Sequence, residues 1–73
     1  MGELPNAVVK RLLSRHGDGL RVSGGALDRA VEAAEAYLGA LARLAAESAR
    51  NDRRKTIMET DIDKARARLG PVA

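Results

Sequence analysis

The amino-acid sequence predicts an all-α fold of three helices, in the order short, long and short. Apolar residues recur at intervals of three and four along most of the 73-residue chain, which is the spacing of one helix face. This pattern is broken by glycines within residues 17–19 and again at residues 70–71, and residues 25–51 contain no proline. The expected helices are therefore at about residues 5–16, 24–51 and 59–69.

The first helix is expected to be about three turns long. Pro5 suits its first turn, where a missing amide hydrogen is tolerated. Its apolar positions repeat at helical spacing as far as Gly17, and they are Val8, Val9, Leu12 and Leu13. Residues 20–22 then indicate a brief extended segment, and Ser23 is a good N-cap for the next helix.

The second helix carries an apolar stripe along its whole length. The members of the stripe are Ala30, Val31, Ala34, Leu38, Leu41, Leu44, Ala45 and Ala49. A helix of some 26 residues is roughly 40 Å long, which exceeds the width of a domain of this size. Two short helices cannot cover such a stripe, so we expect two chains to pack across their long helices as an obligate homodimer.

The third helix is expected to turn three apolar side chains inward and to end at Gly70, which Pro71 follows. The inward residues are Ile62, Ala65 and Leu69. Its acidic residues fall in the first turns, where the helix dipole favours them, and they are Glu59, Asp61 and Asp63.

The charge of the chain is basic and unevenly distributed. The net charge is +3 and the sequence pI is 10.0, with contributions of +2, −2 and +3 from residues 1–22, 23–49 and 50–73. Such segregation favours a polyanionic partner, of which nucleic acid is the commonest, and a solvated basic surface is the alternative.

Several classes of function lack the residues that they need. The chain has no cysteine and one histidine, so we expect no disulfide, no metal site and no cofactor. No serine has a base near it in sequence and no glycine-rich phosphate loop follows a strand, so we expect neither an enzyme nor a small-molecule substrate. Tyr37 is the only aromatic residue, which argues against binding of single-stranded nucleic acid. No apolar run reaches the roughly 18–20 residues of a membrane span, so a soluble, cytoplasmic protein is expected.

A basic cluster at residues 53–55 lies in the tight connection before the third helix. Residues 56–57 are β-formers that could pair with another extended piece such as residues 21–22. Adjacent cations repel unless an acid or a phosphate neutralises part of their charge. Asp61, expected one or two turns inside the third helix, is the internal candidate for that role.

Three local motifs, in this order and spacing, resemble those of the archaeal histones. They are Glu3-Leu4-Pro5 with Arg11, Arg21-Val22-Ser23 before the long helix, and Arg54-Lys55-Thr56-Ile57 followed by Asp61-Ile62. The resemblance covers nearly the whole chain and implies a single histone-fold domain over residues 1–73. It also implies that two chains interlock head to tail in a handshake homodimer, which sets the first loop of one chain beside the second loop of the other.

The resemblance further implies a role for individual residues. The expected DNA-binding residues are Arg11, Arg21, Ser23, Lys55 and Thr56. Among them Arg21 resembles the arginine that enters the minor groove, Thr56 the threonine that holds it, and Lys55 a phosphate-contacting lysine. Arg54 and Asp61 resemble an intrachain clamp, so Arg54 is expected to be structural.

Histone dimers of this kind commonly join end to end through a contact between the end of the long helix and the third helix. At the matching positions this chain has Ser48, Asn51, Asp61 and Lys64, of which only Asp61 keeps the family residue. The serine and the lysine remove apolar burial, and facing lysines would repel across a two-fold contact. Lys64 could instead pair with Asp61 or Asp63 of a neighbour.

The function expected from these observations is that of a chromosome-associated architectural protein. It would bind, bend or wrap double-stranded DNA with little sequence specificity, as homodimers or as tetramers or polymers of them. The alternative is a histone-fold dimerisation module within a transcription or repair complex, for which contact with DNA is secondary.

Overall fold

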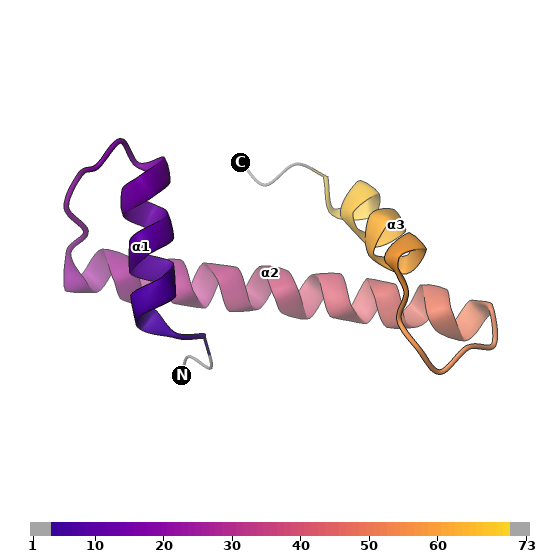
Figure 1. The fold of residues 1–73 in the computed structure, drawn as a ribbon. Helices are drawn as coiled ribbons and strands as arrows, with labels where there is room; N and C mark the ends of the chain where they lie inside the picture. The colour runs from indigo at the N-terminus through magenta and orange to yellow at the C-terminus, as the bar shows by residue number, and fades with distance from the viewer. Residues whose placement is uncertain (1–3, 71–73) are drawn as a thin grey trace. The chain divides into compact units, whose positions relative to one another are not determined.

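The computed structural model describes residues 4–70, and these residues form three α-helices without a strand. The helices are α1 (Asn6–His16), α2 (Gly24–Asn51) and α3 (Glu59–Leu69), as Figure 1 shows. The predicted all-α fold and its short, long, short order are confirmed. The chain divides into two compact units, Met1–Ala36 and Tyr37–Ala73, and α2 contributes residues to both. A single domain over residues 1–73 therefore stays a prediction.

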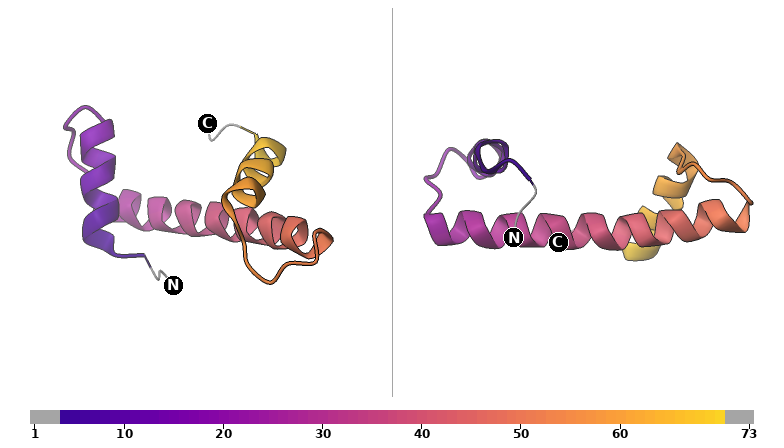
Figure 2. Two further views of the ribbon diagram at one scale, coloured as in Figure 1. Left: turned by 45° about the vertical axis from the view of Figure 1, so that its right-hand side comes forward. Right: turned by 90° about the horizontal axis from the view of Figure 1, so that it is seen from below.

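In the first unit, α1 packs across the beginning of α2, as all three ribbon views in Figures 1 and 2 show. Pro5 lies just before the helix in an extended conformation, and its carbonyl oxygen accepts the Val9 amide at 3.2 Å. The helix ends where the Gly19 amide donates to the Ser14 carbonyl oxygen at 2.8 Å. A Cβ at Gly17 would collide with the Leu13 carbonyl oxygen, so glycine is needed where α1 ends.

Ser23 caps the start of α2, as the sequence predicted. Its Oγ accepts the amide of Ala26 at 3.0 Å, and its carbonyl oxygen accepts the amide of Leu27 at 2.9 Å. One of the otherwise unpaired amides at the helix start is therefore satisfied by a side chain.

The end of α2 has the hydrogen bonds of a Schellman motif, but its left-handed residue is an arginine. The Arg54 amide donates to the Ala49 carbonyl oxygen and the Arg53 amide to that of Arg50, both at 2.9 Å. Arg53 has a φ of 58°, a conformation in which glycine is usual and other L-residues are strained. The basic cluster therefore begins at a strained residue.

Replacing Arg53 by glycine is expected to raise the free energy of unfolding by about 0.5–1 kcal/mol, because relief of the left-handed strain exceeds the entropy that glycine adds to the unfolded chain. Arg53→Ala is the matched control, since it removes the same charge and keeps the strain. Urea denaturation at one protein concentration would compare the two variants with wild type. Equal stability of the glycine and alanine variants would contradict this account.

In the second unit, α3 packs beside the last turns of α2 (Figures 1 and 2). Asp61 is the third residue of α3 and so lies in its first turn, nearer the start than the sequence suggested. Its Oδ2 accepts the Met58 amide at 2.8 Å, which caps the helix start. The helix ends at Gly70, whose φ is 78° and whose amide donates to the Arg66 carbonyl oxygen at 3.0 Å.

The apolar core within residues 4–70 is small. The buried apolar residues are Val31 in the first unit and Ala45, Ala49 and Ala65 in the second. Larger apolar side chains stay exposed, and they are Val8, Leu12, Leu20, Leu38, Ile57 and Met58. Alanines bury little area, and fully burying a leucine or valine contributes roughly 1.5–3 kcal/mol. Within residues 4–70, therefore, none of these six large side chains gives the stabilisation that full burial would provide.

Candidate nucleic-acid interface

The second loop, residues 52–58, is held by a bidentate ion pair between Arg54 and Asp61. Arg54 Nη1 donates to Asp61 Oδ2 at 2.8 Å, and Nη2 donates to Oδ1 at 2.9 Å. The Asp61 side chain is fully buried, and that of Arg54 is 27% exposed. The structure thus brings together the two residues that the sequence assigned to a clamp.

Two further groups complete the hydrogen bonding of the Asp61 carboxylate. Ser48 on α2 donates its Oγ hydrogen to Oδ1 at 2.7 Å, and the Met58 amide donates to Oδ2. The Arg54 hydrogen bonds, and then those from Ser48 and Met58, hold the pKa of Asp61 well below its usual range. The same pairing with Asp61, followed by that with Asp52, raises the pKa of Arg54. The buried carboxylate is therefore ionised and saturated with donors.

The clamp fixes the course of the second loop as well as its charge. Arg54 Nη1 also donates to the Thr56 carbonyl oxygen at 3.0 Å. Asp61 receives hydrogen bonds from α2, from the loop and from the residue before α3. The Arg54 side chain therefore ties the backbone at Thr56 to the start of α3, and such restraint lowers the entropy cost of binding a ligand there.

Two members of this cluster were missed by the sequence reasoning. Ser48 was assigned to an assembly contact, yet it lies three residues from Ala45 on α2, and that spacing places it on the face that α3 covers. Asp52 had no assigned role, yet its Oδ2 lies 3.0 Å from Arg54 Nη2 at the surface. Its position two residues before Arg54 was the only signal in the sequence.

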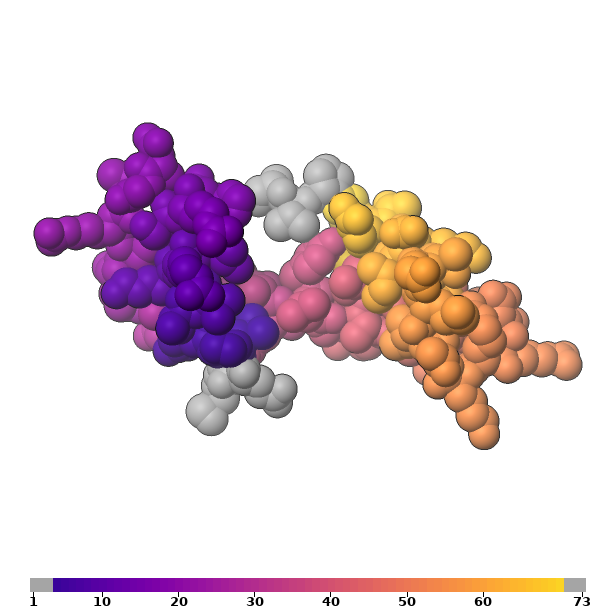
Figure 3. All heavy atoms as spheres, viewed as in Figure 1, coloured from indigo at the N-terminus to yellow at the C-terminus, as the bar shows by residue number. Residues whose placement is uncertain are grey.

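The remaining candidates of the second loop are exposed. Arg53, Lys55 and Thr56 all face solvent. Figure 3 shows long side chains projecting from the orange end of α2 and the loop that follows it. The second loop is therefore a hydrogen-bonded segment that presents cationic groups to solvent.

The candidates of the first unit are exposed too. Arg11 lies on α1, Arg21 in the loop before α2, and Ser23 at the α2 cap. The Ser23 oxygen accepts a backbone hydrogen bond, and its hydroxyl hydrogen can still be donated. Gly24 and Gly25, which begin α2, are exposed, and a Cβ built at either would meet nothing within 4 Å.

Of the four residues expected at a contact between dimers, one is buried and three line a surface groove. Ser48 and Asp61 bind each other, and Asp61 is too deeply buried to pair with a neighbouring Lys64. Ser48, Asn51 and Lys64 line one groove between α2 and α3. Arg68 and Glu47 also line this groove, and they form an exposed ion pair in which Arg68 Nη1 lies 3.0 Å from Glu47 Oε1. The groove is thus lined mainly by polar and charged side chains.

Residues 4–70 contain no group of three or more histidine, cysteine or acidic side chains that could hold a metal ion. None of the helices within these residues is sufficiently long and apolar to cross a membrane.

The amino-acid sequence was compared with models of known protein families. The sequence model of the core histone domain matches residues 6–68. The match covers α1, α2, the first loop (residues 17–23), the second loop and all of α3 except its last residue. No solved structure matches the chain. Because the match covers most of the chain, this protein belongs to the core histone family.

Proposed function

We propose that the protein is an archaeal-type histone, a non-enzymatic architectural protein that binds duplex DNA along the chromosome with little sequence preference. The observation that carries this proposal is the second loop, in which the buried Arg54–Asp61 pair holds the backbone that presents Lys55 and Thr56. Membership of the core histone family supports association with DNA and chromatin.

The chemistry of the exposed groups suits the backbone of duplex DNA. Lysine, arginine, hydroxyl groups and open helix amides contact phosphates without reading base sequence. An arginine that enters a narrow minor groove responds to groove width. Arg21 is the candidate for that role, while Arg11, Ser23, Lys55 and Thr56 are candidates for phosphate contacts. Binding should therefore be sequence-tolerant and should weaken steeply as salt rises.

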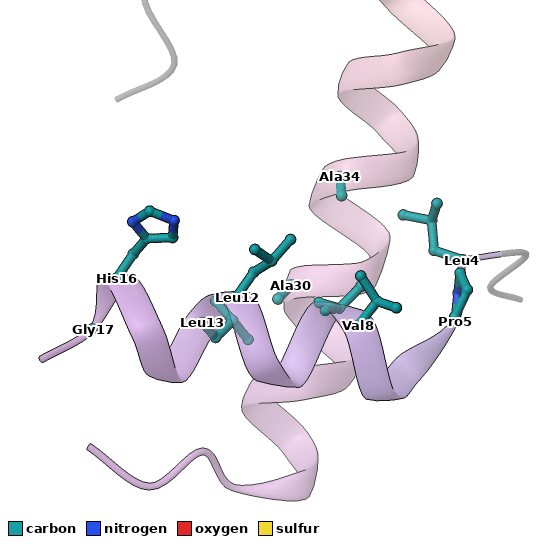
Figure 4. A pocket seen from close by; sticks show the side chains of 10 residues that line it. Leu4, Pro5, Val8, Leu12, Leu13, His16, Gly17, Ala30 and Ala34 are labelled. Atoms are coloured by element: carbon teal, nitrogen blue, oxygen red, sulfur yellow. The ribbon is translucent and has the colours of Figure 1, made fainter. Parts of the chain in front are cut away.

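The proposed active form is a homodimer. In the first unit, an open groove of about 600 Å³ is lined almost wholly by apolar side chains of α1 and α2. Figure 4 shows Val8 and Leu12 of α1 beside Ala30 and Ala34 of α2. A chain with so few buried apolar residues gains the most by placing the apolar surface of a second copy in this groove.

Nuclease protection on long random-sequence DNA tests this function and distinguishes dimers that join along the DNA from isolated dimers. Micrococcal nuclease would digest DNA reconstituted with the protein over a range of protein ratios and salt concentrations. A regular ladder of protected lengths is expected if dimers join along wrapped DNA despite Ser48, Asn51 and Lys64. One short protected length would indicate isolated dimers that bend DNA. No protection even at low salt would overturn the chromosomal function and leave a dimerisation module of a larger complex.

A further inference from the structure

We propose that the outward edge of the Arg54 guanidinium is a phosphate-binding site, which the Asp52 carboxylate occupies until a phosphodiester of duplex DNA displaces it. The inference rests on the proposed function and adds a residue that regulates it. Asp52 would act as an internal competitor of DNA at the second loop.

The donors of Arg54 divide into an inner and an outer set. Nη1 donates to Asp61 and to the Thr56 carbonyl oxygen, and one Nη2 hydrogen also goes to Asp61. Nη2 also donates to Asp52 Oδ2 at 3.0 Å. The inner set fixes the guanidinium plane, so the outer hydrogen is aimed at a defined point near the surface. A phosphate oxygen at that point would meet a preorganised, charge-assisted donor.

The Asp52 carboxylate is weakly held at that point. Its side chain is 57% exposed, and exposed ion pairs contribute little net stability. It also follows the last turn of α2, where the helix dipole disfavours an anion. The Asp52 backbone is fixed separately, because its amide donates to the carbonyl oxygens of Ser48 and Ala49. The carboxylate can therefore turn into solvent without any movement of the helix end.

A DNA phosphate would interact more favourably with this site than the Asp52 carboxylate does. Lys55 follows Arg54 directly and is exposed, so both cations can share one stretch of the DNA backbone. Each displacement must break the Arg54–Asp52 pair and leave a carboxylate close to the DNA. Asp52 should therefore lower the affinity of the dimer for duplex DNA without abolishing binding.

The test is duplex binding by Asp52→Asn, measured by fluorescence anisotropy over a range of salt concentrations. Glu47→Gln is the matched control, since it also removes the carboxylate of an exposed arginine ion pair in the same unit. We expect Asp52→Asn to lower Kd roughly fivefold at moderate salt, as two weak ion pairs per dimer no longer need to be broken. Glu47→Gln is expected to change Kd by less than half as much on a logarithmic scale.

A second variant separates competition from a structural role. Asp52→Glu keeps a carboxylate within reach of Arg54 and is expected to bind like wild type. Circular dichroism and thermal melting would check that each variant folds. Equal tightening by Asp52→Asn and Glu47→Gln would overturn the inference in favour of net charge alone. Weaker or unchanged binding by Asp52→Asn would show that Asp52 only positions Arg54. Failure of the wild type to bind duplex at low salt would instead overturn the proposed function itself.

Discussion

Replacing both Arg21 and Lys55 by alanine is expected to abolish measurable binding to duplex DNA at moderate salt while leaving a folded dimer. Each dimer would lose two arginines from the minor groove and two lysines from phosphates. Each cation that neutralises a DNA charge contributes about 0.9 to the slope of log K against log salt. Kd should therefore rise by roughly two orders of magnitude or more, and the salt slope should fall by about 3–4. Anisotropy titrations of one duplex at several salt concentrations give both quantities.

A matched control separates these contacts from net charge. Arg29→Ala with Arg66→Ala removes the same charge from two exposed positions, one in each unit, that lie outside both loops. We expect this pair to weaken binding only modestly. Circular dichroism and sedimentation would establish that both double variants keep their helices and their oligomeric state. Equal loss in the two variants would show that Arg21 and Lys55 contribute only bulk charge, and the roles assigned to them would be wrong.

Local sequence rules predicted the helices of this protein well, because local chemistry determines them. The glycines that end α1 and α3, and the serine that caps α2, act through backbone groups a few residues away. The helical spacing of apolar residues then locates the three helices and their relative lengths, and this step does not depend on tertiary contacts. The Arg54–Asp61 pair could also be predicted from the sequence. A basic loop next to a helix start needs an acid close by, and Asp61 was the internal acid proposed for that role.

The remaining parts of the site depend on geometry that residue spacing does not encode. Arg53 takes the left-handed position of a Schellman motif, where sequence rules expect glycine. Ser48 turns toward a carboxylate that comes from another helix, and Asp52 shares an arginine with that same carboxylate. These contacts follow from where α3 packs on α2, which no local pattern specifies.

Pairing between the first and second loops is a different kind of prediction. No strand joins residues 21–22 to residues 56–57 within the described part of the chain, and these segments belong to different compact units. In a handshake dimer, residues 21–22 of one chain would instead pair with residues 56–57 of the other chain. The described residues leave apolar side chains exposed, as the sequence predicted, and both the second chain and the pairing of the loops stay predictions.

Replacing Asp61 by asparagine is expected to cause the largest loss of stability among single substitutions in the second unit. The amide would keep the shape of the side chain but remove its charge, so the Arg54 guanidinium would face one acceptor and one donor group. Breaking a buried, hydrogen-bonded pair from one side is costly, and the melting temperature should fall by roughly 10 °C or more. Asp63→Asn makes the same chemical change at an exposed position of α3 and should shift it by no more than a few degrees. Similar shifts in both variants would contradict a stabilising role for the clamp.

The low pKa of Asp61 gives the same clamp a pH signature. In the unfolded chain an aspartate titrates near 3.9, whereas the native carboxylate keeps its charge to lower pH. Above about pH 5 both states are ionised and the full stabilisation is present. As pH falls through about 4, the unfolded state takes up a proton that the native state does not bind, so the free energy of unfolding must decrease. Urea denaturation of wild type and Asp61→Asn between about pH 2.5 and 6 should show their difference in stability shrinking as pH falls. A difference that stays constant over this range would mean that the clamp does not depend on an ionised Asp61.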